Sequence, residues 1–463
     1  MRGALGVILI NMERDLKEKG IWLRDFGQRF VEKLSHIIPI HEYPYWIAAI
    51  LAGFFSVVYG FVFQKAEDFN REVLSESPYW MLFFTPACFL LGAWVVRYVC
   101  PEAQGSGIPQ VMAALEGLKR RGVERFLNEG FGFKSILVKV FSAVVTVLGG
   151  GAIGREGPTI QVSAAIFHMV GMRAKRWDRH ISPDVWLVAG GASGVAAAFN
   201  TPLGGLVFAI EELAGNNFHK LKTSLISAVI IAGIASQWVA GSYLYLGFPR
   251  VGEVDMGVVP WAFLIGGLGG MLGALFGHAV FFFTSLRKRF LTEHWWFIFP
   301  IIAGIIVALI AIYGPAHGTG SGRETMTELL FRDGEEHSGF LLLAARFFSP
   351  VFTYVSGVSG GIFAPSLAAG GALGSYLSAL TGGAYHNLFV LLGMIAFLTG
   401  VTRAPFTAFV LVLEMTDRHS AIFPMMLSAV LATLGAILVD KKSFYERVKD
   451  YYLEGIQQGE SRI

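Results

Sequence analysis

The sequence predicts an all-helical, polytopic integral membrane protein built from two repeated halves that contain membrane-interrupted helices. Three observations lead to this fold class. The chain has 463 residues, of which 54% are hydrophobic and only 15% are charged, whereas soluble domains carry about 25% charged residues. The charges are separated by long apolar gaps. Segments rich in glycine and proline recur in the same order in both halves.

The gaps between charges mark the expected membrane crossings. A helix needs about 20 apolar residues to cross a hydrocarbon core of about 30 Å. Each gap lacks Asp, Glu, Lys and Arg over a sufficient length, and the longest has room for two crossings or several short helices. The gaps run between Glu42 and Lys65, Glu76 and Arg97, Asp184 and Glu211, Lys222 and Arg250, Asp255 and Arg287, Glu293 and Arg323, Arg346 and Arg403, and Arg418 and Asp440.

Residues 1–40 precede the first gap and differ from the rest in charge. Apolar residues such as Ile21, Leu23 and Phe26 recur at helical spacing among mixed charges. This pattern predicts an interfacial amphipathic helix. The apolar run 4–10 is too short for a convincing signal peptide.

Short basic clusters lie between the gaps. Clusters of this kind usually mark cytoplasmic loops, and an acidic loop at residues 333–336 favours the opposite side. The basic clusters are Lys119, Arg120 and Arg121; Arg173, Lys175 and Arg176; Arg287, Lys288 and Arg289; and Lys441 and Lys442. Cys88 and Cys100 are the only cysteines, and their positions in or beside one apolar span predict neither a disulfide framework nor a metal site.

The chain repeats itself at three landmarks. Gly105-Ser106-Gly107 recurs as residues 320–322, and the frame Gly154-x-x-x-Pro158 recurs as Gly361-x-x-x-Pro365. Pro202 precedes Glu211 by the same interval that separates Pro405 from Glu414. We therefore place one transmembrane repeat at residues 41–245, a second at 255–450 and a short cytoplasmic tail at 451–463. Repeated halves are typical of transporters whose site lies between the halves.

The repeated Gly/Pro motifs predict helices that begin inside the membrane. Proline is tolerated in the first helical turn, because its missing N–H would be unpaired there in any case. Such a start leaves backbone N–H groups that need a partner in hydrocarbon. An anion suits them, because a helix N-terminus also carries about +0.5 of an elementary charge. The candidate starts are residues 105–109, 154–158 and 360–365. The alternative is that these glycines only allow helices to pack closely.

These motifs resemble those of the CLC family of chloride channels and chloride/proton antiporters. The resembling residues are Gly105, Ser106, Gly107, Ile108 and Pro109; Gly154, Arg155, Glu156, Gly157 and Pro158; and Gly361, Ile362, Phe363, Ala364 and Pro365. The resemblance covers about residues 40–450 and is to the prokaryotic type, without cytoplasmic regulatory modules. It implies inverted halves, a homodimer with one pathway per subunit, chloride and protons as substrates, and no cofactor.

The resemblance also implies roles for single residues. The Ser106 hydroxyl, the Ile362 and Phe363 backbone N–H groups and the Tyr445 phenol would bind the anion. Glu156 would be the gating glutamate, and Glu212 would pass protons from the inner solution.

Some of these assignments have plainer alternatives. Glu212 stands at the end of a long apolar run, and its alternative is an acid in water at the membrane interface. The alternative for Tyr445 is an interfacial anchor. Glu156 stands in an apolar stretch, where a charge costs about 2.5–3.5 kcal/mol, and its alternative is a salt bridge to Arg155. Glu211 recurs as Glu414, which predicts a structural role at a helix end.

The predicted function is chloride/proton exchange across a membrane, and the short chain favours a bacterial inner membrane with both termini cytoplasmic. A passive chloride channel is the main alternative, and a carboxylate at Glu212 favours the antiporter. A membrane hydrolase using Ser106 is a remote third reading, because no histidine falls in a repeated motif. We therefore expect no enzymatic activity.

Overall fold

The computed structural model describes residues 42–118, 120, 122–174, 183–213, 222–241, 244–252, 254–290, 295–331, 339–383 and 385–458. From Tyr45 onward the chain forms one compact unit. The predicted amphipathic helix at residues 1–40 lies outside the described residues. So do Lys119, Arg121, Lys175, Arg176 and the acidic loop at 333–336.

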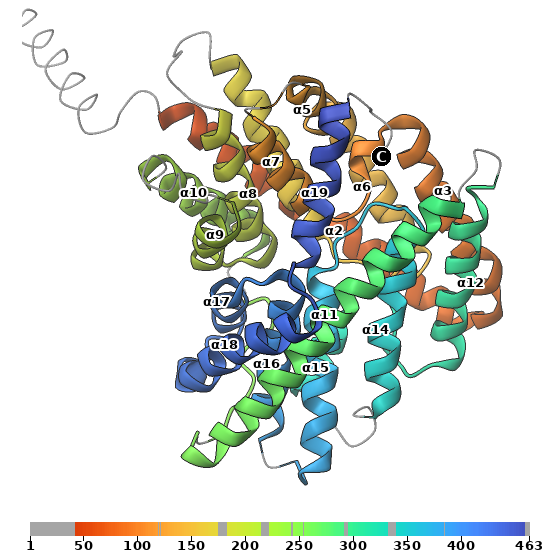
Figure 1. Cartoon of the computed structure of the whole chain (residues 1–463), viewed down its shortest axis with the longest axis vertical. Helices are drawn as coiled ribbons and strands as arrows, with labels where there is room; N and C mark the ends of the chain where they lie inside the picture. Colours follow the sequence, from red (N-terminus) through yellow and green to blue (C-terminus); the bar gives the residue numbers. More distant parts are fainter. Residues whose placement is uncertain are drawn as a thin grey trace, which may run out of the picture. The chain divides into compact units, whose positions relative to one another are not determined.

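The described residues are built from helices (Figure 1). Up to residue 240 these are α2 (Tyr43–Glu76), α3 (Met81–Val99), α4 (Ile108–Gly117), α5 (Val123–Gly130), α6 (Phe133–Leu148), α7 (Glu156–Ala174), α8 (Pro183–Phe199), α9 (Pro202–Phe208) and α10 (Lys222–Ala240). The remainder are α11 (Val259–Phe290), α12 (Ile298–Tyr313), α13 (Arg323–Phe331), α14 (Phe340–Val355), α15 (Phe363–Leu380), α16 (His386–Thr402), α17 (Pro405–Thr416), α18 (Ile422–Val439) and α19 (Phe444–Gln458). The last helix continues past residue 451, where we placed the start of a tail.

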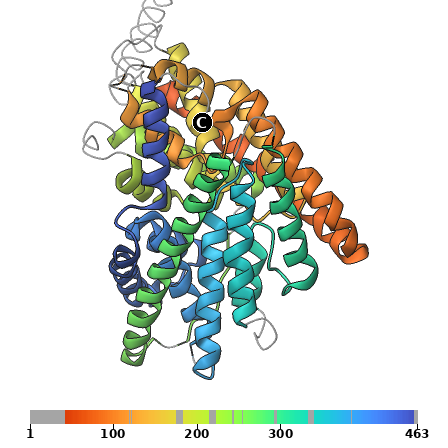
Figure 2. The same cartoon turned by 45° about the vertical axis from the view of Figure 1, so that its right-hand side comes forward.

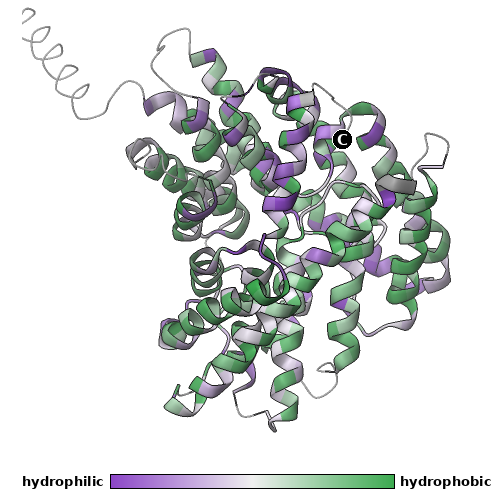
Figure 3. Cartoon of the chain, viewed as in Figure 1, coloured by the Kyte–Doolittle hydropathy of each residue, from purple (hydrophilic) through white to green (hydrophobic). Residues whose placement is uncertain are grey.

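Several helices are long enough to cross a membrane and others are not. Within the described residues, five helices have the length and hydropathy of a span, and the pair α5–α6, bent by 52°, would make a sixth. Shorter apolar helices such as α12, α14, α16 and α17 accompany them. Figure 3 shows hydrophobic residues along much of most helices. The predicted fold class, an all-helical polytopic membrane protein, is confirmed.

The helices pack in corresponding pairs. Helix α7 lies along α8, and α15 lies along α16. The long helix α11 runs beside α14, α15, α16 and α18 (Figures 1 and 2). Glycines allow the close approach: a Cβ on Gly190 of α8 would lie 2.6 Å from the Ala164 Cα, and one on Gly370 of α15 would overlap the Gly393 carbonyl. Glycines outside the repeated motifs therefore let these helices pack closely.

The segments before α9 and α17 have the same local structure. Asn200 and Arg403 both adopt left-handed backbone conformations, with φ of 57° and 66°. Pro202 and Pro405 then begin α9 and α17. The two segments that we aligned by sequence therefore end one helix and start the next in the same way.

Three cations are buried, and two of them, Arg287 and Arg346, flank the charge-free segments described above. Lys139, Arg287 and Arg346 are at most 7% exposed. Each donates a hydrogen bond to a backbone carbonyl: Lys139 to Gly105 O, Arg287 to Val355 O and Arg346 to Gly320 O. Irregular backbone leaves such carbonyls without helical partners, and a buried cation satisfies them. Lys139 therefore lies inside the fold, and Arg287, which we expected in a loop, lies in α11.

Candidate anion site

The three predicted helix starts meet through their backbones. Gly105 N donates to Val358 O at 2.9 Å, and Gly360 N donates to Gly105 O at 3.1 Å. Gly154 and Gly361 exchange two hydrogen bonds of 2.7 and 2.9 Å. Helices α4, α7 and α15 begin at Ile108, Glu156 and Phe363, directly after these contacts. The N-termini of the three helices therefore converge, as the repeated motifs predicted.

Small residues are required where the loops touch. A Cβ on Gly157 would lie 2.5 Å from the Ser106 Oγ and 2.6 Å from its carbonyl oxygen. Gly107 has φ of +103°, and a Cβ there would lie 2.7 Å from Gly157 O. Pro109 lies in the first turn of α4. Pro158 and Pro365 stand at the third position of α7 and α15. The motif glycines and prolines thus place Ser106 against the start of α7.

Ser106 and Tyr445 bring two hydroxyls to this junction. Both residues are fully buried, and their side chains come within interaction range of one another. Neither hydroxyl has a hydrogen-bond partner among the described residues. A buried polar group without a partner costs about 1–3 kcal/mol. Two such hydroxyls side by side, at converging helix N-termini, are donors suited to an anion.

Ile362 and Phe363 supply the start of α15. Ile362 is the N-cap and Phe363 the first helical residue, and both are buried. Their N–H groups precede any helical carbonyl that would accept from them. The Phe363 ring packs at 5.5 Å, between centroids, against Phe199 at the end of α8. The Phe363 side chain therefore lines the junction while its backbone N–H belongs to the helix start.

Lys139 is a residue that we did not assign to the site. Its Nζ donates to Gly105 O at 2.9 Å and to Ala103 O at 3.1 Å. It therefore braces the loop that carries Ser106 and brings its amino group close to the junction. Its signal in the sequence was a lysine in the middle of a largely apolar segment, and an ionisable residue there is a functional hypothesis by default.

Tyr445 is positioned by a capping box at the start of α19. Ser443 Oγ accepts from Glu446 N at 3.1 Å, and Glu446 Oε2 accepts from Ser443 N at 2.9 Å. This reciprocal pair satisfies two N–H groups at the helix start. The signature Ser443-x-x-Glu446 was readable in the sequence.

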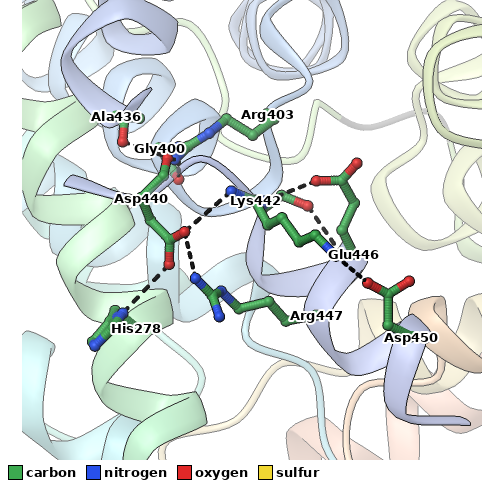
Figure 4. A network of polar contacts seen from close by, with 10 residues as sticks. His278, Gly400, Arg403, Ala436, Asp440, Lys442, Glu446, Arg447 and Asp450 are labelled. Carbon is green, nitrogen blue, oxygen red and sulfur yellow. Dashed lines mark hydrogen bonds and ion pairs between the residues drawn. The ribbon is translucent and has the colours of Figure 1, made fainter. Parts of the chain in front are cut away.

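A polar network holds the turn between α18 and α19 (Figure 4). Asp440 accepts hydrogen bonds from Arg447 at 2.5 Å and from Lys442 N at 3.1 Å, and pairs with His278 at 3.3 Å. Arg403 donates to the Ala436 and Asp440 carbonyls at 2.8 and 2.7 Å. Burial alone would raise the pKa of Asp440, but the hydrogen bonds from Arg447, Lys442 and His278 hold it below its usual value. The network therefore holds the turn that precedes Tyr445.

Glu156 is the first residue of α7 and is only 1% exposed. Its Oε1 accepts a hydrogen bond from the Tyr245 phenol at 3.0 Å. Its Oε2 lies over Gly154, where any Cβ would overlap it, and has no hydrogen-bond partner among the described residues. Arg155 contributes charge to its surroundings. The hydrogen bond from Tyr245 was not foreseen, because Tyr245 lies in the connection between α10 and α11.

Glu212 lies in a π-helical turn, Ala209–Leu213, that extends α9. It is half-buried and has Glu211, Glu446 and Lys449 in its electrostatic environment. Tyr445 lies within electrostatic reach of both Glu212 and Glu156. A π-helical turn inside a helix frequently marks a functional site. Glu212 is therefore neither sealed in the core nor fully in solvent.

Glu211 and Glu414 cap each other's helices. Glu211 accepts from Phe406 N at 3.1 Å and from Thr407 N at 2.7 Å, at the start of α17. Glu414 accepts from Leu203 N at 3.2 Å and from Gly204 N at 2.8 Å, at the start of α9. The predicted structural role of this recurring glutamate at a helix end is confirmed.

The comparisons with known proteins agree with this geometry. The family model of voltage-gated chloride channels matches residues 87–436. The chain belongs to this family, the CLC family. The family consists of channels and transporters, so the comparisons lend the hydrolase reading no support.

Individual relatives match along most of their length. The H(+)/Cl(-) exchange transporter ClcA of Cronobacter sakazakii is 31% identical over 433 residues, which cover 87% of this chain and 88% of the relative. ClcA of Vibrio cholerae serotype O1 is 29% identical over 426 residues, covering 87% and 86%.

Solved structures share the fold. A slow cyanobacterial Cl⁻/H⁺ antiporter superposes with a TM-score of 0.76 at 23% identity, covering 89% of this chain and 98% of that one. A CLC-type fluoride/proton antiporter gives a TM-score of 0.72 at 20% identity, covering 87% and 96%.

Proposed function

We propose that this CLC protein exchanges chloride for protons across a membrane. The observation that carries the proposal is a buried glutamate, Glu156, at the first position of a helix whose N-terminus meets two others. The relatives named as H(+)/Cl(-) exchange transporters support the same activity. Chloride is the bound substrate ion, and the proposal needs no cofactor.

The anion site uses dipoles and hydroxyls. Ser106 Oγ and Tyr445 Oη donate beside one another, and the backbone N–H groups of Ile362 and Phe363 donate from the start of α15. No cationic side chain needs to touch the ion. Partial charges suit transport, because binding must be weak enough for release.

Glu156 acts as both gate and proton carrier. Its carboxylate stands at a helix N-terminus, where a negative charge is favoured. It therefore competes with chloride for the binding position at the converging helix starts. When the carboxylate is protonated it loses this attraction and leaves room for the anion. Proton binding and anion binding at one place are thereby coupled.

Glu212 delivers protons from the inner side. Its half-buried position near Glu446 and Lys449 gives it contact with both polar surface groups and the core. Tyr445 lies within electrostatic reach of Glu212 and Glu156, so the proton and anion routes approach one another near the junction. We place the protein in a bacterial inner membrane as a homodimer, with one pathway per subunit and both termini cytoplasmic.

The test is proton movement in sealed proteoliposomes under an imposed chloride gradient. The wild type should drive protons uphill. Glu212→Gln should keep chloride flux and lose proton movement, whereas Glu156→Gln should lose proton coupling and make chloride flux insensitive to pH. Glu72→Gln, at an exposed carboxylate on α2, is the matched control and should behave as the wild type.

A passive chloride channel is the second candidate. If chloride moves through the wild type but protons never follow, the antiporter is excluded and Glu212 is an interfacial acid. Replacing chloride by bromide or nitrate in the same assay would then define the selectivity of either activity.

A further inference from the structure

The Glu156 carboxylate is held by a phenol from outside the three repeated motifs. Tyr245 Oη donates to Glu156 Oε1 at 3.0 Å. Tyr245 is 4% exposed and Glu156 is 1% exposed, so water does not compete freely for this hydrogen bond. A hydrogen bond to an ionised group in such a setting is about twice as strong as one between neutral groups.

The Tyr245 ring is itself fixed on two sides. It packs edge-on against Phe199, with 5.3 Å between centroids and 70° between planes, and Phe199 contacts Phe363 of the anion site. The Arg323 guanidinium lies over the Tyr245 ring at 4.9 Å from its centroid. The next residue, Leu246, donates its backbone N–H to Met415 O at 3.2 Å. The phenol is therefore aimed at Glu156 and has little freedom to turn away.

Arg323 connects this arrangement to the second repeat. It is the first residue of α13 and directly follows Gly320-Ser321-Gly322, the counterpart of the motif that carries Ser106. A cation over an aromatic face draws on the electron density of the ring. That makes the phenol O–H a stronger donor.

We propose that Tyr245 is a positioning residue for Glu156. The Tyr245 hydroxyl holds the deprotonated carboxylate in the position described above, and Arg323 strengthens this hydrogen bond. This inference rests on the proposed role of Glu156 as gate. The phenol favours the ionised carboxylate because an ionised acceptor binds a donor more strongly than a neutral one. Protonation weakens the hydrogen bond and frees the side chain to move.

Removing the phenol hydroxyl should therefore make Glu156 easier to protonate. Other groups also act on Glu156 and stay unchanged in such a variant. They are the charges of Arg155 and of Glu67 on α2, and the phenols of Tyr59 on α2 and Tyr445 on α19. With these constant, a shift in the pH profile reports the Tyr245 hydrogen bond.

The experiment measures chloride flux against pH in proteoliposomes for the wild type and Tyr245→Phe. We expect the pH of half-maximal flux to rise by about one unit, the size of a charge-assisted hydrogen bond of roughly 1.5 kcal/mol. Tyr59→Phe is the matched control. Its phenol is buried and acts on Glu156, but it makes no hydrogen bond within the described residues. The Tyr59→Phe profile should stay within about 0.3 of a unit of the wild type.

Two further variants separate the outcomes. Arg323→Gln should shift the pH profile in the same direction by a smaller amount. This variant replaces Tyr245→Phe as the test if Tyr245→Phe does not fold. In a Glu156→Gln background, Tyr245→Phe should add no shift. A Tyr245→Phe profile that superimposes on the wild type, or equal losses at all pH values for both tyrosine variants, would overturn the inference. If the wild type moves no protons, that result contradicts the proposed function, whatever the pH profile of Tyr245→Phe.

Discussion

At the scale of single residues, the anion site depends on how closely the Ser106 loop can approach α7. Gly157 makes that approach possible, because any Cβ there would lie 2.5 Å from the Ser106 hydroxyl. Gly157→Ala should therefore push the loop and the helix apart. We expect a loss of about 1–3 kcal/mol in the free energy of unfolding, together with a large fall in chloride flux.

The control for this change is an alanine at a glycine with open space. A Cβ on Gly267 of α11 has nothing within 4 Å. Gly267→Ala should keep full flux and gain up to about 1 kcal/mol, because alanine favours a helix over glycine. Thermal unfolding in detergent and flux in proteoliposomes measure both effects. Equal flux in the two variants would contradict the role given to Gly157.

Asp440 gives a second prediction at this scale. Its folded-state pKa lies below its usual value, so its contacts stabilise the protein above the unfolded-state pKa of about 4 and are lost as pH falls through the folded-state value. At pH 7 the free energy of unfolding of the wild type should exceed that of Asp440→Asn by about 1–2 kcal/mol. That difference should shrink below roughly pH 4. Thermal unfolding from pH 3 to pH 7 tests it, and a difference independent of pH would exclude the network as its source.

At the scale of helices, the most informative feature is the exchange of caps between α9 and α17. Each helix starts with a proline and has its next N–H groups bound by a glutamate at the end of the other. A carboxylate there satisfies backbone donors and also the helix dipole. The two short helices therefore stabilise one another, although neither is long enough to be stable alone.

The corresponding prediction concerns Glu211 and Glu414. Glu211→Ala and Glu414→Ala should each lower stability by about 1–2 kcal/mol. The glutamine variants should lose less, because an amide oxygen still accepts hydrogen bonds. Thermal unfolding of all four variants in the same detergent measures this order. An alanine variant as stable as its glutamine counterpart would show that the cap contributes nothing.

At the scale of the whole molecule, the sequence predicted what depends on local chemistry. Glycine and proline at fixed spacing indicated the three helix starts, because these residues determine backbone conformation by themselves. The recurrence of Glu211 as Glu414 indicated a role at a helix end, because a carboxylate can accept hydrogen bonds from the unpaired N–H groups there. The contact of Lys139 with the Ser106 loop and that of Tyr245 with Glu156 could not be predicted, since both depend on which distant segments meet. Periodicity says nothing about that.

The site joins helices from the whole chain, so chloride should stabilise the whole fold. Donors come from before α4, from the start of α15 and from α19, and α7 begins between them. A ligand that binds only the folded state adds RT ln(1 + [L]/Kd), or about 2.7 kcal/mol at 100 times Kd. The unfolding midpoint should therefore rise with chloride at constant ionic strength when gluconate is the replacement anion. Ser106→Ala and Tyr445→Phe should flatten this rise, because each removes a donor, whereas Asp440→Asn should lower the midpoint in both anions and keep the slope. If wild-type protein unfolds at the same midpoint in chloride and in gluconate, chloride does not bind at this junction.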